Sequence, residues 1–580
     1  MSARFPDVAG HVAALESQWA LSPGDPACRA SVEAGLAELR VAWREQPHIF
    51  APDVLARLAK LAKVIKRAHE GPVPMHVALG ALKETFGYDR FRPGQHEIIE
   101  AVLAGRDCVG IMPTGAGKSL TYQIPARVLG GTTLVVSPLI ALMKDQVDGV
   151  NEYGLRATYL NSSLPPEERR RREEGLATGA YELVYAAPEG IEASVGRALS
   201  RARIRLVAVD EAHCISQWGH DFRPAYRNLA GLKRKFGGLP VLALTATATP
   251  EVGRDIIEQL GMDNPVTFRG SFFRPNLRLH AYKKGDGQTK TRDSILSIIR
   301  SRRGESGIVY CITRKSVESI STFLQESGIK AAAYHAGLEP RERDRVQEAF
   351  LRDDYDVVVA TIAFGMGINK SNIRYVIHRD MPRSVESYYQ EIGRAGRDGL
   401  DADCVLFYSW ADVMSYDRFG EDGPAEAAAR NRAQTREMFE MAERRLCRHQ
   451  AIVRYLGETL PPCVKSCDVC ADWDLLDTLP AAKAARGPVL ARLEASLGGR
   501  VPLETGGADG ELFARLKTLR KRLADERKLP AYIVFSDATL RAMALNRPRS
   551  LDEFLTLPGV GPKKLAEYGE AFLRELQSGS

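Results

Sequence analysis

Residues 108–119 read Cys-Val-Gly-Ile-Met-Pro-Thr-Gly-Ala-Gly-Lys-Ser, the segment with the clearest structural signature in the chain. An apolar run leads into a glycine-bearing loop and a helical stretch follows, which is the order of a phosphate-binding loop. The glycines let backbone N–H groups approach phosphate, Lys118 would reach the β- and γ-phosphates, and Ser119 would bind Mg²⁺. Met112 stands where the general pattern has its first glycine. The expected ATP-binding loop comprises Met112, Pro113, Thr114, Gly115, Ala116, Gly117, Lys118 and Ser119.

Short apolar runs of the same kind alternate with helical stretches from about residue 82 to 410. Strands of parallel sheets have this pattern because helices cover both of their faces. The number of runs predicts an α/β fold with two domains in tandem and a boundary near residues 270–290. Besides 108–111, the predicted strands include 133–136, 206–209, 241–244, 307–310 and 356–360.

Two carboxylates, Asp210 and Glu211, directly follow one of these runs, 92 positions after Lys118. A carboxylate at the C-terminal end of a strand can hold Mg²⁺, so Asp210 joins Ser119 as an expected Mg²⁺ ligand. Its neighbour Glu211 is expected to orient the attacking water.

Three residues upstream of the loop are candidates for binding the adenine ring. Gln95 offers both a donor and an acceptor, which matches the edge of adenine. Tyr88 or Arg92 could stack on the ring face.

Two arginines three residues apart, Arg394 and Arg397, can face the same way near the end of the second predicted domain. Arginines that reach a transferring phosphoryl group raise hydrolysis rates by about 10³–10⁵-fold. Because these two lie in the second domain, they would reach a nucleotide on the first only if the domains close over it. Hydrolysis would then drive relative domain motion. The expected catalytic set is Lys118, Asp210, Glu211, Gln390, Arg394 and Arg397.

Four of the nine cysteines fall close together, with 15, three and two residues between successive members. Four thiolates at such spacings can close a tetrahedral Zn²⁺ site. A closed site of this kind is structural, because it has no open position for catalysis. Buried free thiols are the alternative. The expected ligands are Cys447, Cys463, Cys467 and Cys470.

Segments in this order resemble the motifs of RecQ-family superfamily 2 DNA helicases. The most diagnostic is 214–224, Cys-Ile-Ser-Gln-Trp-Gly-His-Asp-Phe-Arg-Pro, which resembles the aromatic-rich loop of RecQ proteins. The resemblance covers about residues 82 to 470 and the C-terminal module. The other segments are 86–88, 112–119, 137–146, 210–213, 245–248, 334–338, 363–370 and 390–397.

The resemblance implies two tandem RecA-like domains with parallel sheets, then a helical zinc-binding module and a small all-α HRDC-like domain. ATP would bind between the two RecA-like domains. The expected division is a helical extension at 1–80, RecA-like domains at 81–278 and 279–412, the zinc module at 413–475, a linker at 476–509 and the HRDC-like domain at 510–580.

The resemblance also implies an ATP-dependent 3′→5′ DNA helicase that translocates on single-stranded DNA and unwinds duplexes in repair and recombination. In that family the aromatic-rich loop senses single-stranded DNA and couples binding to hydrolysis. Stacking of a base on an aromatic ring is worth about 1–3 kcal/mol. Two lysines after a glycine-bearing turn in the HRDC-like domain could contact phosphates. The expected DNA-binding residues are Ser137, Pro138, Trp218, Phe222, Arg223, Thr361, Lys563 and Lys564.

The segment between the zinc module and the HRDC-like domain is shorter than in RecQ proteins that have the full set of domains. Only 40 residues separate Cys470 from Glu511, too few for a winged-helix domain of about 100 residues. This leaves open an ATP-driven translocase or a strand-annealing or remodelling factor with weak unwinding. An RNA-remodelling helicase is a further rival. So is a DNA-binding scaffold whose nucleotide site only switches conformation.

Composition agrees with an ordinary globular protein, with 44% hydrophobic and 26% charged residues. Its net charge of +7 permits a polyanionic partner without demanding one. No apolar run of 18 residues or secretory signal is evident, so we expect a cytoplasmic, nucleoid-associated protein with no membrane contact. The expected cofactors are ATP, Mg²⁺ and structural Zn²⁺. We expect a monomer that binds single-stranded and forked or branched DNA, with single-stranded-DNA-binding or recombination proteins as partners.

Overall fold

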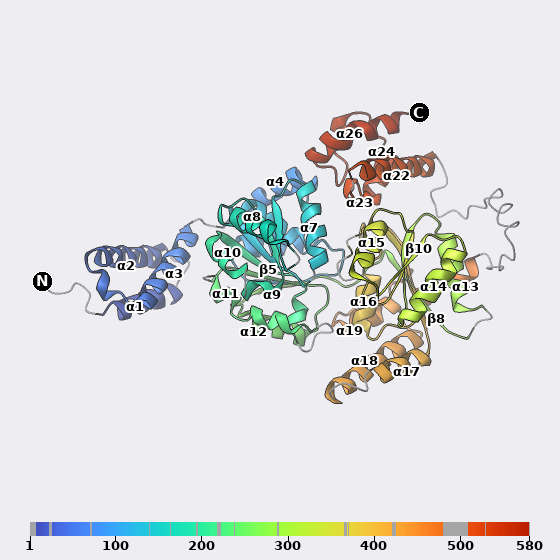
Figure 1. Ribbon diagram of the computed structural model, residues 1–580, viewed down its shortest axis with the longest axis horizontal. Coiled ribbons are helices and arrows are strands. Elements are labelled where there is room, and N and C mark those ends of the chain that lie inside the picture. Colours follow the sequence, from blue (N-terminus) through green and yellow to red (C-terminus); the bar gives the residue numbers. More distant parts are fainter. Residues whose placement is uncertain are drawn as a thin grey trace.

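Two parallel β-sheets, joined by a short linker at residues 270–276, form the middle of the chain (Figure 1). The linker lies inside the predicted boundary region. The computed structural model describes residues 7–21, 26–69, 72–138, 140–162, 164–192, 195–216, 222–236, 238–286, 289–364, 368, 370–419, 425–479, 508–527 and 529–578.

The first sheet has seven strands in the order β3-β4-β2-β5-β6-β1-β7, and every pairing is parallel. The neighbours β5, β6 and β1 matter most, because the loops at their carboxyl ends meet at one edge of the sheet. The bounds of the seven strands are β1 Cys108–Ile111, β2 Thr132–Val136, β3 Ala157–Leu160, β4 Leu183–Ala186, β5 Ile204–Val209, β6 Val241–Thr245 and β7 Val266–Arg269.

The second sheet has six strands in the order β10-β11-β9-β12-β13-β8, again all parallel. The predicted α/β class with two tandem parallel-sheet domains is confirmed. All six named strand predictions coincide with observed strands to within two residues. The bounds are β8 Leu277–Lys283, β9 Ser306–Tyr310, β10 Ala331–Tyr334, β11 Val357–Ala360, β12 Ile373–His378 and β13 Ala402–Tyr408.

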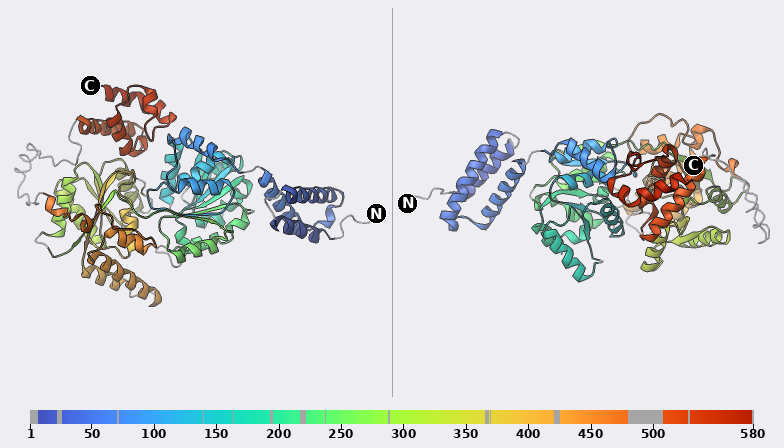
Figure 2. Two further views of the ribbon diagram at one scale, coloured as in Figure 1. Left: turned by 180° about the vertical axis from the view of Figure 1, so that it is seen from behind. Right: turned by 90° about the horizontal axis from the view of Figure 1, so that it is seen from above.

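Helices flank the sheets, and α12 (Pro250–Leu260) shows why they form (Figures 1 and 2). The Thr249 side chain accepts from the Val252 N–H at its start, Pro250 occupies its first turn, and Gly261 ends it with φ 63°. Its apolar residues recur every four positions and are buried. The other helices of these domains are α4 Met75–Phe86, α5 Gln95–Leu103, α6 Leu120–Val128, α7 Ile140–Glu152, α8 Pro166–Ala177, α9 Pro188–Glu192, α10 Val195–Arg201, η2 Ala212–Ile215, η3 Pro224–Leu229, α11 Leu232–Lys235, α13 Thr291–Ser301, α14 Arg314–Glu326, α15 Pro340–Leu351 and α16 Val385–Ile392.

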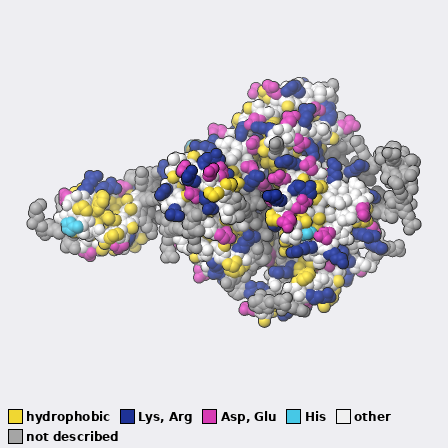
Figure 3. Space-filling view, viewed as in Figure 1, with side chains coloured by type: hydrophobic (Ala, Val, Ile, Leu, Met, Phe, Trp, Pro, Cys, Tyr) yellow, Lys and Arg dark blue, Asp and Glu magenta, His cyan; other side chains and the backbone are white. Residues whose placement is uncertain are grey.

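The N-terminal helices form a bundle at one end of the molecule, beyond the first domain (Figure 1). Val12, Val32 and Leu39 are fully buried in an apolar core of their own. Charges of both signs are interspersed over the face of the molecule in Figure 3, as the small net charge implies. The bundle elements are α1 Val8–Leu21, α2 Pro26–Glu45, η1 Pro47–Ile49 and α3 Pro52–His69.

A short helical module follows the second sheet and is joined to its edge. Leu279 of β8 forms a parallel bridge with Cys467, and its N–H donates to the Ser466 carbonyl at 3.0 Å. The module therefore continues the sheet beyond β8. Its elements are α17 Trp410–Phe419, α18 Ala425–Glu443, α19 Arg448–Tyr455, α20 Asp468–Ala471 and η4 Leu476–Thr478.

The chain closes with a small all-helical domain that lies over the junction of the two sheet domains (Figures 1 and 2). Phe535, Phe554 and Phe572 are fully buried in its core. Of the expected linker, residues 480–507 lie outside the described part of the chain. Among the helices that the structure describes, none is long and apolar enough to cross a membrane. The domain comprises α22 Ala508–Glu526, α23 Ala531–Val534, α24 Asp537–Asn546, α25 Leu551–Leu555 and α26 Pro562–Gln577.

Candidate nucleotide site, zinc centre and DNA-facing segments

The phosphate-binding loop connects β1 to α6, and its glycines are required by its backbone. Gly115 and Gly117 have φ angles of 85° and 82°, in the left-handed region that side chains disfavour. A Cβ on Gly117 would lie 2.5 Å from Gln95 Nε2. Lys118 points back into the loop, where its Nζ donates to the Met112 carbonyl at 3.2 Å.

Gln95 faces the phosphate-binding loop, and its amide is fully engaged there. Its Nε2 donates to the carbonyls of Ala116 and Gly117 at 3.2 and 3.0 Å, and its Oε1 accepts the Arg92 N–H at 2.9 Å. Arg92 Nη1 in turn donates to the Gly115 carbonyl at 3.0 Å. The segment before α5 therefore fixes the loop, and Gln95 Nε2 could donate to adenine only by giving up one of its two hydrogen bonds to the loop carbonyls.

Asp210 and Glu211 lie at the end of β5, one strand away from the loop across β6. Burial raises the pKa of Asp210 to about 7, and the adjacent Glu211 carboxylate acts in the same direction. Burial lowers the pKa of Lys118, whereas the two carboxylates act to raise it. Glu211 also has a φ of 48°, which is strained for a residue with a side chain. Two close carboxylates facing one lysine are suited to a bound divalent cation.

A chain of hydrogen-bonded polar side chains leads from these carboxylates toward Gln390 of the second domain, and its members His213, Thr245 and Thr247 were not predicted to have individual roles. His213 Nδ1 lies 3.4 Å from a Glu211 carboxylate oxygen and 2.9 Å from Thr245 Oγ1. Thr245 Oγ1 donates to the Thr247 carbonyl and accepts the Thr247 N–H. Thr247 Oγ1 in turn accepts from Gln390 Nε2 at 3.3 Å across the domain boundary. In the sequence these residues fall within the segments 210–213, 245–248 and 390–397, but nothing there indicates that they are hydrogen-bonded to one another.

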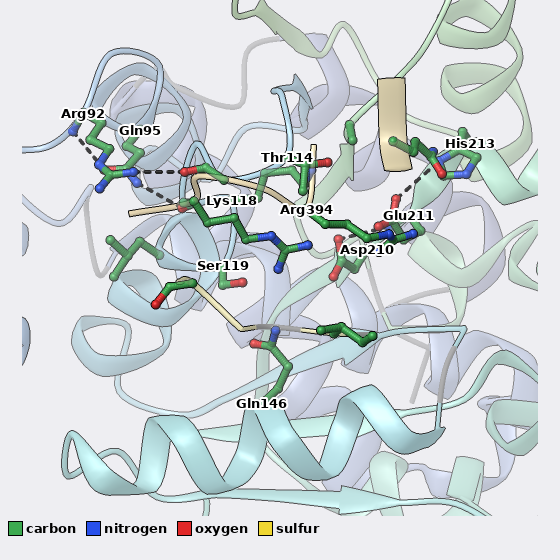
Figure 4. A pocket seen from close by; sticks show the side chains of 18 of the residues that line it. Arg92, Gln95, Thr114, Lys118, Ser119, Gln146, Asp210, Glu211, His213 and Arg394 are labelled. Carbon is green, nitrogen blue, oxygen red and sulfur yellow. Dashed lines mark hydrogen bonds and ion pairs between the residues drawn. The ribbon is translucent and has the colours of Figure 1, made fainter. Parts of the chain in front are cut away.

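A cavity of about 360 Å³ brings the predicted nucleotide residues of both domains together (Figure 4). Arg397 reaches the phosphate-binding loop, because a Cβ on Gly115 would lie 3.4 Å from its Cγ. Burial lowers the pKa of Arg397 to about 10, and the neighbouring Arg394 acts in the same direction. Gln146 of α7 also lines the cavity. The predicted residues in its lining are Tyr88, Arg92, Gln95, Thr114, Gly115, Gly117, Lys118, Ser119, Pro138, Asp210, Glu211, Gln390, Arg394 and Arg397.

The four predicted zinc ligands converge. The Sγ atoms of Cys447, Cys463, Cys467 and Cys470 all lie within 4.8 Å of one another. In a tetrahedral ZnS₄ site with 2.3 Å bonds the sulfur atoms are about 3.8 Å apart. Cys447 also begins α19, where its sulfur accepts the Gln450 N–H at 3.5 Å. The donor set and its convergence fit structural Zn²⁺.

Two of the predicted DNA-facing segments are tied to each other. Arg223 Nη1 donates to the Pro138 carbonyl at 3.1 Å, which joins the end of the aromatic-rich loop to the segment after β2. Phe222 lies 5.6 Å below the Arg227 guanidinium. Ser137 is buried, and its hydroxyl has no hydrogen-bond partner among the described residues. Trp218 lies outside the described residues.

The remaining predicted DNA contacts lie elsewhere. Thr361 follows β11 and lines a second cavity of about 380 Å³, beside α17 and α18. Lys563 Nζ donates to the Asn151 carbonyl at 3.0 Å. Lys564 is only 4% exposed, and its Nζ donates to Tyr153 Oη and to the Ile533 carbonyl. The expectation that Lys564 contacts DNA does not fit this structure, because the ammonium is enclosed between two domains.

Family comparisons match four models in chain order. A DEAD/DEAH box helicase model matches residues 92–255, and a helicase conserved C-terminal domain model matches 290–399. A RecQ zinc-binding model matches 410–471, and an HRDC domain model matches 509–576. Together they span the two sheet domains, the module with the cysteines and the C-terminal helices.

Three bacterial relatives match this chain over nearly their whole length. The chain is 39% identical over 605 residues to a Pasteurella multocida (strain Pm70) protein named ATP-dependent DNA helicase RecQ, with 88% of this chain and 95% of that protein covered. A Bacillus subtilis (strain 168) protein of the same name is 38% identical, with 87% and 99% covered. A Haemophilus influenzae relative of the same name is also 38% identical.

Proposed function

The chain belongs to the RecQ family, and on that premise we propose that it hydrolyses ATP between its two RecA-like domains in order to move along DNA and unwind it. It is accordingly an ATP-dependent DNA helicase of RecQ type. The observation that carries the proposal is the cavity that gathers the phosphate-binding loop, two carboxylates and two arginines from opposite sides of the domain boundary.

Each group in the cavity has a role that its chemistry supports. The backbone of 112–119 and Lys118 hold the phosphates, and Glu211 orients the attacking water. Arg394 and Arg397 stabilise the charge that develops on the transferring phosphoryl group. Gln390 of the second domain donates a hydrogen bond to Thr247 of the first, and through this contact it couples nucleotide binding to the position of the second domain.

Ser119 and Asp210 are the side chains that would hold Mg²⁺. When bound, this ion neutralises charge on the phosphate oxygens. Zn²⁺ on the four cysteines would have a structural role, because all four positions of a tetrahedral ion are then occupied by protein.

DNA would cross both domains by way of Pro138, Phe222, Arg223 and Thr361, with translocation in the 3′→5′ direction. The predicted Ser137 side chain is buried and would lie beneath this path. Trp218 would stack on a base, and its loop would couple DNA binding to hydrolysis. The Arg223–Pro138 hydrogen bond supports this path, since it makes two of these segments move as one. The lysines of α26 are left out of the path.

The proposed substrates are single-stranded and forked or branched DNA, in repair and recombination at the nucleoid. The proposed protein partners are single-stranded-DNA-binding and recombination proteins, and the proposed state is a monomer. A translocase or annealing factor with weak unwinding is not favoured, because relatives matched over 95–99% of their length are named as DNA helicases.

The test is ATP hydrolysis with and without single-stranded DNA, together with unwinding of tailed duplexes. We expect hydrolysis to rise on adding an oligodeoxynucleotide, and unwinding only of duplexes with a 3′ tail. Lys118→Ala should lower both activities by about 100-fold or more, because the phosphates lose their buried cation. Lys83→Ala is the control, since this exposed lysine pairs only with the exposed Asp89 across 3.0 Å among the described residues.

Three results would contradict the proposal. An ATP hydrolysis rate that does not change when DNA is added would exclude an ATP-driven motor that moves along DNA. Equal stimulation by RNA would favour an RNA-remodelling enzyme. DNA annealing or binding that survives Lys118→Ala with no unwinding by the wild type would favour a scaffold.

A further inference from the structure

The linker between the two sheets contains a buried arginine, Arg274, that touches both halves of the nucleotide cavity. The residue is 8% exposed. Nη1 donates to the Thr114 carbonyl in the phosphate-binding loop at 3.3 Å. The same nitrogen donates to the Gly393 carbonyl at 3.0 Å, and Nη2 donates to the carbonyls of Ala395 and Gly396 at 3.0 and 2.7 Å.

These partners are unusual for a buried guanidinium. Buried arginines are normally paired with carboxylates. Among the described residues no carboxylate lies within ion-pair distance of Arg274, and the nearby Asp398 is paired with Arg374 at 2.6 Å. The guanidinium is therefore compensated by backbone carbonyls, three from the turn that carries Arg394 and one from the loop.

A second linker side chain binds the same turn. Asn276 Nδ2 donates to the carbonyls of Gly396 and Leu400 at 2.9 and 3.0 Å. The linker itself is anchored, because the Phe272 carbonyl accepts from Tyr389 Oη at 3.0 Å and its N–H donates to Glu458 at 2.7 Å. The turn before Arg397 is thus fixed to a rigid support.

We propose that Arg274 is a positioning residue that sets the turn of Arg394 and Arg397 against the phosphate-binding loop when the domains are closed. This inference rests on the proposed ATP hydrolysis. The planar guanidinium of an arginine can donate hydrogen bonds to carbonyls in two directions at once. A lysine ammonium on a flexible side chain cannot reproduce this geometry. Three of the four bonds stay within the linker and the second domain. Only the longest, to Thr114, must break when the domains separate.

The test compares Arg274→Lys and Arg274→Met with wild type at saturating single-stranded DNA. We expect kcat for ATP to fall about 10- to 100-fold while KM changes less than about threefold, because misplaced arginines act on the transition state more than on binding. Asn276→Ala should give a smaller fall of the same kind. Arg278→Lys is the matched control, since this arginine lies four residues further on in a half-exposed pair with Asp401.

A purely structural role would lower the melting temperature and the active fraction. Because loss of active protein lowers the apparent kcat at unchanged KM, kcat is expressed per nucleotide-binding site, titrated with a fluorescent ATP analogue, and a fall that vanishes after this normalisation would overturn the inference. The inference is overturned if folded Arg274→Lys keeps kcat within threefold of wild type, or if KM rises with kcat unchanged. If Arg274→Met does not fold, Arg274→Lys and Asn276→Ala still decide. If wild type itself shows no DNA-stimulated hydrolysis, the proposed function fails instead.

Discussion

Single residues in the nucleotide cavity are held in states that cost stability in the absence of ligand. Asp210 and Glu211 lie side by side, and burial together with this proximity raises the pKa of Asp210 to about 7. On the opposite side, burial lowers the pKa of Arg397 to about 10. Unfavourable charges of both signs, separated across one cavity, are typical of sites that bind a charged ligand.

Replacing Asp210 by asparagine should therefore stabilise the ligand-free protein while abolishing hydrolysis. The folded pKa of about 7 exceeds the ordinary 3.8, so between these values the folded chain binds more protons and stability from this group falls as pH rises. At pH 8 the substitution removes a charged carboxylate, and we expect the melting temperature of Asp210→Asn to exceed that of wild type by about 2 °C or more. At pH 5.5, midway between the two pKa values, the unfolded carboxylate is already ionised, so we expect about half of that gain.

Differential scanning fluorimetry at the two pH values measures this difference. Asp89→Asn, at an exposed carboxylate, should change the melting temperature equally at both. An Asp210→Asn gain that is as large at pH 5.5 as at pH 8 would show that titration of Asp210 is not its cause.

At the level of elements, the cysteine module supports the edge of the second sheet. Cys467 bridges Leu279 of β8, and Asp468 accepts the Ala281 N–H at 3.0 Å while pairing with Arg448. A metal on the cysteines would therefore hold both α19 and the β8 edge. It lies apart from the nucleotide cavity, whose lining contains none of the four cysteines.

Cys467→Ser should accordingly lower zinc content and thermal stability without changing nucleotide affinity. We expect about one zinc per wild-type chain and markedly less in the variant, because a serine hydroxyl is a poor ligand for Zn²⁺ beside three thiolates. Metal analysis, melting temperature and the Kd of a fluorescent ATP analogue are the measurements. The control is Cys28→Ser in the N-terminal bundle, and this variant should retain about one zinc per chain. Zinc well below one equivalent in wild type would refute the assignment.

At the level of the whole molecule, the C-terminal domain bridges the two RecA-like domains. Lys563 and Lys564 bind Asn151 and Tyr153 of the first domain. Lys521 donates to the Asp353 carbonyl of the second at 3.1 Å. Figures 1 and 2 show the domain spanning the same junction that encloses the nucleotide cavity. We therefore expect the C-terminal domain to lose its contacts with one of the two RecA-like domains when these separate.

Gly87→Ala should release the C-terminal domain from the first RecA-like domain. Gly87 has a φ of 72°, and a Cβ there would lie 2.3 Å from the Val560 carbonyl oxygen, a backbone atom that cannot turn aside. Gly105→Ala is the matched control, because Gly105 has a φ of 75° and nothing within 4 Å. Both variants carry the same backbone strain, so their difference reports docking alone.

Hydrogen exchange of amides in α26 and α4 measures this release. We expect faster exchange at the facing surfaces in Gly87→Ala than in Gly105→Ala. Equal exchange in the two variants would mean that the contact at Gly87 does not hold the domain.

The local parts of this protein are readable from its sequence. The glycines of 112–119, the carboxylates after 206–209 and the spacing from Cys447 to Cys470 each depend on residues close together in the chain, or on a strand that leads into them. Apolar runs marked both sheets, because a strand covered on both faces must be apolar along its length. Strand order was not predicted, since pairing depends on neighbours distant in sequence.

Only the tertiary structure decided how distant parts meet. It turned the amide of Gln95 into the phosphate-binding loop, buried Lys564 against Tyr153 and placed the Arg274 fork between Thr114 and Gly393. Periodicity shows which face of a helix is buried, but not what covers it. The partners of these three side chains lie 21 to 411 positions away in the sequence. The packing of whole domains determines these contacts, and no local sequence pattern predicts it.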